Sequence, residues 1–319
     1  MHEALQDRFW QGRRRLYRIV SGTVSNPLGQ WNHWWQSHAL GVLLDRADRT
    51  GDDAARRQAA DLVEGMRSKN GGVLTNDFYD DMGWLALALL RMPGHQADAR
   101  TLRKAIRRGE MPEGGIAWAR QHPEFRNTPA TGPAAIGAVR EGMRSGDDEL
   151  VTWGLGLVRW MARTVVSADG DVADGQRRHG DGSMTIDAAR YSYNYGLVVG
   201  ADVAAFQATG ERDYLDHAGL VARAACLELG DPSTGVWRSE GKGDRALFRG
   251  ILARYLAELI AVSGDEALAK DLFRQGDAVW RSSRDGSAGH DWTSPPGRRL
   301  ELSEQVGGLL VLEAVARLA

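Results

Sequence analysis

The sequence has little of several features that mark particular classes of protein. Its 319 residues include a single cysteine, Cys226, which excludes an internal disulfide and a zinc site built on thiolates. A formal net charge of −2 gives no electrostatic footprint for nucleic acid or for an anionic membrane surface. No apolar run approaches the roughly 20 residues needed to span a bilayer, and the N-terminus has no apolar signal-peptide region. We therefore expect no nucleic-acid partner, no membrane span and a cytoplasmic location.

Motifs of several enzyme classes are also missing. The eight histidines show no paired-ligand spacing, and the fingerprints of serine hydrolases, phosphate-binding loops and dinucleotide-binding folds are absent. The aspartate-rich loop that begins at Asp169 is only loosely similar to a calcium loop, because Gly180 stands at the twelfth position, where an acidic ligand is needed. We therefore assign no metal ion and no cofactor.

Helical periodicity, in contrast, runs through most of the chain, while alternating strand patterns are scarce. It predicts about twelve helices, and the first of them is amphipathic with Arg13, Arg14 and Arg18 on its outer face. The predicted helices cover residues 3–20, 33–49, 54–67, 82–92, 97–108, 131–144, 148–165, 191–208, 213–228, 246–263, 265–282 and 303–317.

The connections between these helices are of two kinds. Short ones place a glycine after one helix and an acid before the next, as in Thr50-Gly51-Asp52, which is the chemistry of antiparallel helical hairpins. Six such pairs predict a single all-α domain, 1–319, whose inner and outer helices close into a ring; an open solenoid of helical pairs is the alternative. Longer loops rich in glycine, proline and aromatic residues would gather at one end of the ring, at 21–32, 68–81, 109–130, 166–190, 229–245 and 283–302.

One stretch, NDFYDDMGWLALALLR at 76–91, carries a pair of carboxylates ahead of a strongly helix-forming segment. We expect the pair, Asp80 and Asp81, in the loop or first turn before that helix. Two adjacent carboxylates cannot ionise independently, and a sugar-cleaving enzyme needs one of them charged and the other protonated. The neighbouring side chains could hold hydroxyls or pack on the C–H face of a sugar; they are Asn76, Asp77, Phe78, Tyr79 and Trp84.

A structural interpretation of the same pair is also open. Acids at the start of a helix are favoured because they cap its free N–H groups and complement its dipole. Neighbouring residues on a regular helix do not face each other, so Asp80 and Asp81 can reach one substrate only if the backbone there is irregular.

Other segments could supply further contacts to a sugar, and 11 tryptophans are many for this length. Each candidate also has a plain structural explanation: a core tryptophan, an ordinary turn or an exposed ion pair. The candidates lie at the start of the second helix, in the middle loops and near the C-terminal helices. They are Trp34, Trp35, Gln36, His38, Gly115, Trp118, Tyr193, Asn194, Arg249, Arg254, Asp291 and Trp292.

Taken together, these segments resemble glycoside hydrolase family 76, the α-1,6-mannanases. The resemblance runs in order through Trp34 to Ala39, Asn76 to Trp84, Gly114 to Ile116, Gly132 to Ala134, Tyr193 to Gly196, Phe248 to Ile251 with Arg254 and Tyr255, and Asp291 with Trp292. It implies an (α/α)6 barrel and a retaining endo-mechanism on α-1,6-linked mannose. It also implies that Asp80 is the nucleophile and Asp81 the acid/base.

Two positions depart from the family pattern and bear on the substrate. Tyr195 stands where the family tends to have glutamine, and Ala117 where an aromatic residue is common. Both are expected to line the sugar cleft. The sequence therefore predicts a monomeric glycosidase, or a transglycosidase, whose partner is a mannan or mannooligosaccharide. A sugar epimerase or unsaturated-uronide hydrolase on the same barrel and a non-catalytic carbohydrate-binding protein are the alternatives.

Overall fold

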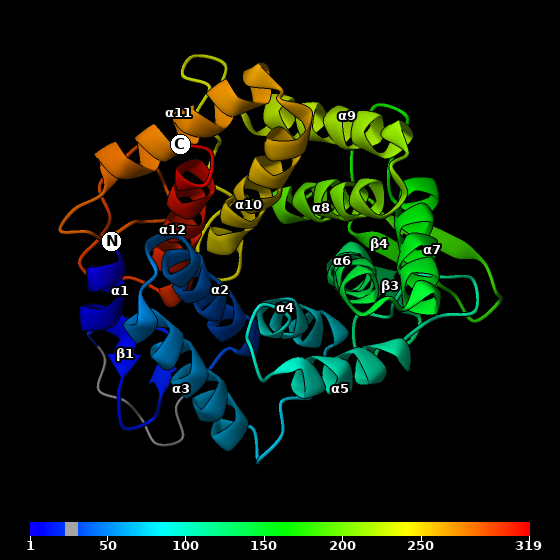
Figure 1. Ribbon diagram of the computed structural model, residues 1–319. Helices are drawn as coiled ribbons and strands as arrows, with labels where there is room; N and C mark the ends of the chain where they lie inside the picture. Colours follow the sequence, from blue (N-terminus) through cyan, green and yellow to red (C-terminus); the bar gives the residue numbers. More distant parts are fainter. Residues whose placement is uncertain (23–30) are drawn as a thin grey trace. The chain divides into compact units, whose positions relative to one another are not determined.

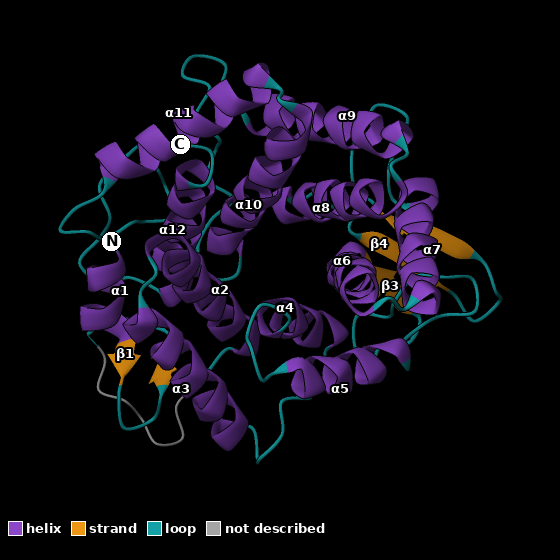
Figure 2. Cartoon of the chain, viewed as in Figure 1, coloured by secondary structure: helices purple, strands orange, loops and turns teal. Residues whose placement is uncertain are grey.

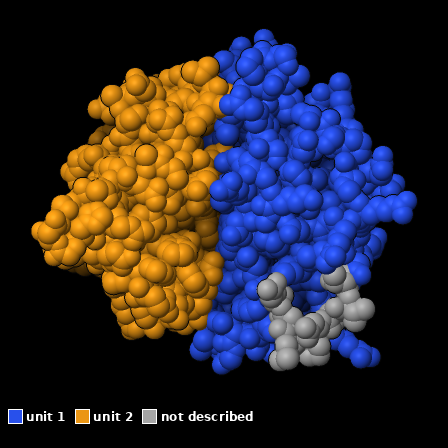
Figure 3. Space-filling view, turned by 180° about the vertical axis from the view of Figure 1, so that it is seen from behind, with its two compact units in different colours: residues 1–74, 229–257, 266–319 blue, residues 75–228, 258–265 orange. Residues whose placement is uncertain are grey.

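Helices dominate the computed structural model, which describes residues 1–22 and 31–319, and strands are few (Figures 1 and 2). The chain divides into two compact units, coloured separately in Figure 3. Unit 1 comprises residues 1–74, 229–257 and 266–319, and unit 2 comprises residues 75–228 and 258–265. The single domain predicted from the sequence stays a prediction. No helix among the described residues combines the length and the apolarity that a membrane crossing requires.

Unit 1 contains the N-terminal and C-terminal helices. Within it, α2 packs against α3 and α12, and α12 also contacts α1 and α11. The last residues of α10 belong to unit 2. The elements are α1 (His2–Phe9), β1 (Trp10–Gln11), β2 (Leu16–Tyr17), α2 (His33–Thr50), α3 (Asp53–Lys69), α10 (Arg245–Ser263), α11 (Glu266–Ser282) and α12 (Leu302–Ala316).

Unit 2 is organised around α6, which packs against α4, α7 and α8 (Figure 1). A small antiparallel sheet in the order β3-β4-β5 lies in the same unit. The elements are α4 (Tyr79–Leu89), α5 (Gln96–Arg107), β3 (Phe125–Asn127), α6 (Thr128–Ser145), α7 (Asp148–Thr164), β4 (Gly175–Arg178), β5 (Met184–Asp187), α8 (Ser192–Thr209) and α9 (Arg212–Leu229).

Most of the predicted helices have the boundaries that their capping signals indicate. Asp52 accepts hydrogen bonds from the first turn of α3, and Asp147 does so for α7. Gly51 and Gly146 end the preceding helices with positive φ angles of 69° and 70°, which glycine adopts without strain. Tight turns between consecutive helices are therefore confirmed.

The predicted helix at 3–20 is wrong beyond Phe9. The chain instead forms a two-stranded hairpin, in which the side-chain amide of Gln36 bonds both the N–H and the C=O of Tyr17, at 3.0 and 2.8 Å. The turn brings the carbonyl oxygen of Arg15 against Gly65, where an added Cβ would lie 2.1 Å from it. Buried pairing thus overrides the helical pattern. The loop expected at 21–32 lies largely outside the described residues.

The three-stranded sheet was not predicted. It joins two of the expected long loops, because β3 comes from the loop at 109–130 and β4 and β5 come from the loop at 166–190. Gly175 permits the close pairing, since a Cβ there would lie 2.5 Å from the carbonyl oxygen of Arg126. The sheet matters for the site because it fixes Asp174, whose C=O accepts a hydrogen bond from the N–H of Thr128 at the start of α6.

Candidate active site

The carboxylate pair lies in the first turn of α4. Phe78 precedes the helix without a side-chain capping bond, and the N–H of Tyr79 donates to the C=O of Trp118 at 2.9 Å. This bond ties the start of α4 to the loop that carries Trp118. The helix begins at Tyr79 rather than at residue 82, so the irregular backbone expected at Asp80 and Asp81 is not found. Helical side chains tilt toward the N-terminus, so both carboxylates, in the first turn, project toward the open end of α4, where one substrate can meet both of them.

Asp80 is held by two donors, one on each oxygen. Its Oδ1 accepts the N–H of Asp81 at 2.9 Å, and its Oδ2 accepts the indole N–H of Trp118 at 3.1 Å. Burial raises the pKa of Asp80 to about 7, although both donors favour the ionised form and oppose the rise. The negative charge of Asp174 adds to the rise. Asp80 therefore changes its charge near neutral pH.

Asp81 is positioned by a different side chain. The Nδ2 of Asn76 donates to Oδ2 of Asp81 at 2.6 Å, and the Oδ1 of Asn76 accepts the N–H of Phe78 at 3.0 Å. Both ends of the amide are used, so its orientation is fixed. The two neighbouring carboxylates thus have separate partners, which gives the pair the asymmetry that acid and base roles require.

Asp174 is a third acid of the site, and the sequence did not single it out as a site residue. The Nδ2 of Asn194 donates to its Oδ1 at 2.9 Å, and Asn194 is fully buried. Burial raises the pKa of Asp174 to about 6 against the effect of that hydrogen bond, with a further rise from the charge of Asp187. Asp174 stands in an aspartate-rich loop, and only the unpredicted pairing of β3 with β4 brings it to the site.

Trp118 is the aromatic side chain most closely joined to the pair. Besides its bond to Asp80, its ring stacks on His122 with centroids 5.2 Å apart and lies 5.4 Å from the ring of Phe78. Phe78 is exposed and Trp118 is half-buried. Together they present aromatic surface beside the carboxylates.

Other predicted residues of unit 2 are buried or have structural partners. Tyr79 and Trp84 are buried, so they support α4 rather than face a ligand. Asp77 is half-exposed and bonds Gln121 Nε2 at 2.9 Å. Gly115 packs on Trp160, where a Cβ would meet the indole at 2.7 Å, so the tryptophan accounts for the glycine, and the predicted sugar contact stays a prediction.

The prediction that Ala117 and Tyr195 line a cleft is also wrong. Ala117 is buried, and the phenol of Tyr195 donates to the carboxylate of Glu228 and lies 3.4 Å from Oδ1 of Asp171. Tyr193 is half-buried, with its ring 6.1 Å from that of Tyr191.

In unit 1, four site residues were predicted at the start of α2, and the structure gives them different roles. Trp34 is half-buried, and the indoles of Trp34 and Trp35 both donate to Asp244. Trp35 and Gln36 are buried, and the amide of Gln36 is used by the backbone of Tyr17. Burial and the charge of a nearby arginine lower the pKa of His38 well below its ordinary value. Gln36 and His38 are therefore core residues, which also removes the histidine on which an epimerase would depend.

The predicted binding residues near the C-terminal helices are structural as well. Arg249 is buried, bonds the C=O of Trp237 at 2.6 Å and lies 3.6 Å from the ring centroid of buried Trp292. Arg254 forms an ion pair with Asp45. The carboxylate of Asp291 accepts hydrogen bonds from two residues of its own turn, Thr293 and Ser294.

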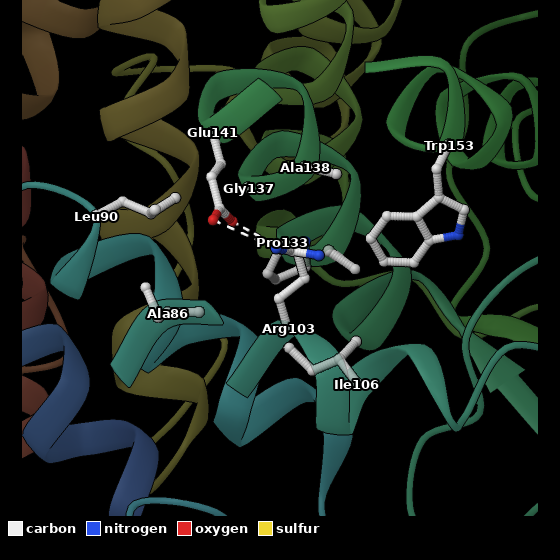
Figure 4. Close-up of a pocket in the computed structure, with 11 residues that line it drawn as sticks. Ala86, Leu90, Arg103, Ile106, Pro133, Gly137, Ala138, Glu141 and Trp153 are labelled. Carbon is white, nitrogen blue, oxygen red and sulfur yellow. Dashed lines mark hydrogen bonds and ion pairs between the residues drawn. The ribbon is translucent and has the colours of Figure 1, made fainter. Parts of the chain in front are cut away.

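A pocket in unit 2 does not include the carboxylate pair (Figure 4). Its only charged side chains, Arg103 and Glu141, bond each other at 2.8 and 3.4 Å and leave an otherwise apolar wall. It is therefore not a site for acid–base chemistry. The lining residues are Ala86, Leu90, Ala99, Arg103, Ile106, Pro133, Ala134, Gly137, Ala138, Glu141 and Trp153.

Comparison with protein families gives a match over nearly the whole sequence. Residues 1–315 match the model of glycosyl hydrolase family 76. The chain belongs to this family. The predicted enzyme class, a glycoside hydrolase, is therefore confirmed. A comparison with curated protein sequences gave no significant match.

Solved structures of family 76 enzymes and related proteins are similar to this one. The GH76A α-1,6-mannanase from Salegentibacter sp. HEL1_6 has a TM-score of 0.91 and 31% identity, over 99% of this chain and 97% of that chain. The Lin0763 protein from Listeria innocua has a TM-score of 0.91 and 28% identity, over 99% and 94%. The family 76 mannosidase Bt3792 from Bacteroides thetaiotaomicron has a TM-score of 0.84 at 19% identity, over 99% and 96%, and bears on the fold alone. These likenesses confirm the predicted fold class, all-α with the helical pairs of an (α/α)6 barrel.

Proposed function

We propose that this family 76 member is a retaining glycoside hydrolase that cleaves α-1,6-linked mannosides in mannan or mannooligosaccharides. Asp80 is the nucleophile and Asp81 is the general acid/base. The observation that carries the proposal is the pair itself, in which Trp118 donates to Asp80 and Asn76 donates to Asp81. Each carboxylate has its own donor, and both lie at the start of one helix.

The similar Salegentibacter enzyme supports this assignment of residues and substrate. A variant of it in which two consecutive aspartates are replaced by asparagine is inactive and was solved in complex with α-1,6-mannotriose. The corresponding alanine variant was solved with α-1,6-mannotetrose. In the present chain, Asp80 and Asp81 are consecutive aspartates that take side-chain donors from Trp118 and Asn76 respectively.

The proposed reaction has two steps. In the first, the carboxylate of Asp80 attacks the anomeric carbon while Asp81 gives its proton to the glycosidic oxygen, and the bond between that carbon and oxygen breaks. In the second, Asp81 takes a proton from water, and the water oxygen displaces Asp80 from the anomeric carbon. Two inversions at one carbon retain its configuration.

The surroundings of Asp80 bear on the first step. A nucleophilic carboxylate must be ionised, and the N–H groups of Asp81 and Trp118 point at its two oxygens as that form requires. Burial and the charge of Asp174 hold its pKa near 7, so the ion is poorly solvated and gains more from bonding to the sugar than a hydrated ion would.

Hydrolysis of α-1,6-mannotetraose, followed by NMR, tests the proposal. We expect release of shorter mannooligosaccharides whose new reducing ends appear first in the α configuration. Asp80→Asn and Asp81→Asn should each abolish turnover and should still bind the sugar in calorimetry. A wild-type protein that binds the tetrasaccharide without cleaving it would instead be a carbohydrate-binding protein.

We also propose a cytoplasmic, monomeric enzyme. The single cysteine is compatible with a reducing compartment. Cell fractionation and light scattering test the two statements separately. Chain-length dependence of product formation distinguishes endo action from exo action, and products longer than the substrate would identify transglycosylation.

A further inference from the structure

An aspartate in unit 1 is held by two indoles. The Nε1 of Trp35 donates to Oδ1 of Asp244 at 2.7 Å, and the Nε1 of Trp34 donates to the same oxygen at 3.0 Å. The Nδ2 of Asn32 lies 3.4 Å from it. A carboxylate oxygen has two lone pairs, so these donors saturate Oδ1. All of the hydrogen bonds that the described residues donate to this carboxylate go to Oδ1. With respect to these residues, Oδ2 can still accept hydrogen bonds.

The same bonds fix the direction of Oδ2. Asp244 is exposed, and an exposed aspartate on a loop ordinarily samples several rotamers. Here its donors come from the first turn of α2, where Asn32 accepts the N–H of Trp35 and caps the helix. Since α2 is buried over most of its length, the indoles are rigid supports, and Oδ2, to which no described residue donates, is pre-oriented.

Trp34 adds an aromatic surface next to that oxygen. Its ring is supported by the edge of His38, at a centroid distance of 5.4 Å, and by Phe248 at 6.2 Å. Both supports are buried, whereas Trp34 keeps part of its surface exposed. Because the Nε1 of Trp34 bonds Oδ1 of Asp244, its ring and the free Oδ2 are adjacent.

We propose that Asp244 and Trp34 form a binding subsite for one pyranose unit of the glycan. Oδ2 of Asp244 accepts a hydrogen bond from a sugar hydroxyl, and Trp34 packs against the C–H face of the ring. The inference rests on the proposed substrate, since a 1,6-linked mannose keeps its 2-, 3- and 4-hydroxyls free as donors. Asp244 binds the glycan and takes no part in the bond-breaking step.

A purely structural role, in which Asp244 only satisfies the two indoles, makes a different prediction. Asparagine at this position keeps an oxygen for the indoles but replaces Oδ2 with an NH₂ group, which donates and cannot accept. A structural role therefore tolerates Asp244→Asn, whereas a sugar-binding role does not.

The experiment measures binding of α-1,6-mannotriose by calorimetry to the full chain carrying Asp80→Asn and Asp81→Asn, with and without Asp244→Asn. We expect Asp244→Asn to raise Kd by about tenfold or more, the effect of losing a hydrogen bond to a charged group, with little change in Tm. The matched control is Asp231→Asn, a half-buried aspartate of unit 1, whose carboxylate accepts hydrogen bonds from Ser233 and Thr234 of its own turn. It should leave Kd unchanged.

An unchanged Kd for Asp244→Asn, or an equal rise for Asp231→Asn, overturns the subsite. If Asp244→Asn lowers Tm substantially, Asp244→Glu keeps the charge and the acceptor for the indoles but moves the free oxygen by one methylene. It should weaken binding, and wild-type affinity would overturn the proposal. Cleavage by the wild-type enzyme is scored separately. Normal cleavage with Asp244-independent binding refutes only the subsite, and Asp244-dependent binding without cleavage refutes only the proposed reaction.

Discussion

Three helices of this protein begin near a pair of consecutive aspartates, and the pairs differ in what their oxygens bond. At α7, Asp147 accepts the N–H of Leu150 at 2.9 Å, and at α3, Asp52 accepts the N–H groups of Ala54 and Ala55. At α4, the preceding residue, Phe78, makes no such bond, and the pair lies inside the first turn. Asp80–Asp81 is therefore displaced from the capping position that the other two pairs occupy.

That displacement decides the chemistry of the side chains. Backbone donors lower the pKa of half-buried Asp52, with the largest effect from the N–H of Ala55, and the guanidinium of Arg46 lowers it further. Burial raises the pKa of Asp80 instead, and its partners include Trp118, 38 residues along the chain. A carboxylate that caps a helix is stabilised as an ion by its own helix, whereas one that takes partners from other loops can be tuned.

The largest predicted effect comes from replacing aspartate by asparagine at the pair of α4, with the same substitution at the pair of α7 as the control. Asp80→Asn should reduce kcat/KM on α-1,6-mannotetraose by about 10⁴-fold or more, because the amide cannot act as the nucleophile. Asp147→Asn should leave kcat/KM unchanged and cost less than about 1 kcal/mol in the free energy of unfolding, since asparagine caps helices as well as aspartate does. Comparable activity losses in both variants would refute the distinction between the pairs.

The dependence of kcat/KM on pH sharpens the comparison. If Asp80 must be ionised, kcat/KM falls as the pH drops below about 7, the value to which burial raises its pKa. Trp118→Phe removes a donor that favours the ion, so the fall should move to higher pH. Asp174→Asn removes a neighbouring negative charge, so it should move to lower pH. Shifts of the same sign in both variants would contradict this account.

Ionisation of Asp80 is needed for activity but should lower the stability of the folded wild-type protein. The folded-state pKa of Asp80 lies above the ordinary value of about 3.9, so its ionisation destabilises the wild-type protein as the pH rises toward 7. Thermal unfolding of the Asp80→Asn protein should therefore match the wild type at pH 4 and exceed it at pH 8.

The sequence was a good guide to helices because their signals are local. Periodicity and the glycine–acid turns predict eleven of the helices in the described residues to within a few residues, and the Asp80–Asp81 stretch is recognisable from its local sequence. The N-terminal helix failed because Tyr17 pairs with Gln36 through a contact 19 residues away. The β3-β4-β5 sheet was missed because its pairing is non-local and its strands carry polar side chains such as Arg177.

Site residues were harder to predict because residue type does not reveal burial. Arg249 and Trp292 have the types that sugar sites use, yet they stack on each other in the core. Asp174 and Asp244 were not predicted as site residues, because the role of each depends on partners distant in the sequence. These partners are Asn194 for Asp174 and the indoles of Trp34 and Trp35 for Asp244. Contact between distant segments, rather than composition, defines these positions.

A buried aspartate of α8, which bonds a histidine and neither member of the pair, tests the role of burial alone. Asp202 is 1% exposed and bonds the ring of His217 at 2.7 Å; burial raises its pKa to about 6 despite that bond. His217→Ala should cost about 3 kcal/mol in the free energy of unfolding at pH 8, because the buried carboxylate loses its partner. The cost should be smaller at pH 5, where Asp202 is protonated.

Urea unfolding at the two pH values measures this cost. The control is Arg281→Ala, which breaks an exposed ion pair with Asp277 and should cost less than about 1 kcal/mol. An equal cost for His217→Ala and Arg281→Ala would mean that burial does not govern how much an aspartate depends on its partner.

The smallest predicted effect is that of Gly137→Ala, which should change the free energy of unfolding without changing kcat/KM. Gly137 lies in α6 on the wall of the apolar pocket (Figure 4), and a Cβ there would meet Leu87 at 3.6 Å and Leu90 at 3.9 Å, ordinary contact distances. Gly137→Ala should therefore stabilise the protein by about 0.5–1 kcal/mol, because alanine loses less backbone entropy in a helix. Gly132→Ala in the same helix should destabilise it, since its Cβ would lie 2.7 Å from Leu197.

Activity per folded molecule should be unchanged in Gly137→Ala, as measured by kcat/KM beside thermal unfolding. The added methyl group changes neither the donors on Asp80 nor the amide on Asp81. If stability alone governed activity, kcat/KM would follow Tm in this variant. Because the pair is tuned by Trp118, Asn76 and burial, we expect the two quantities to move independently.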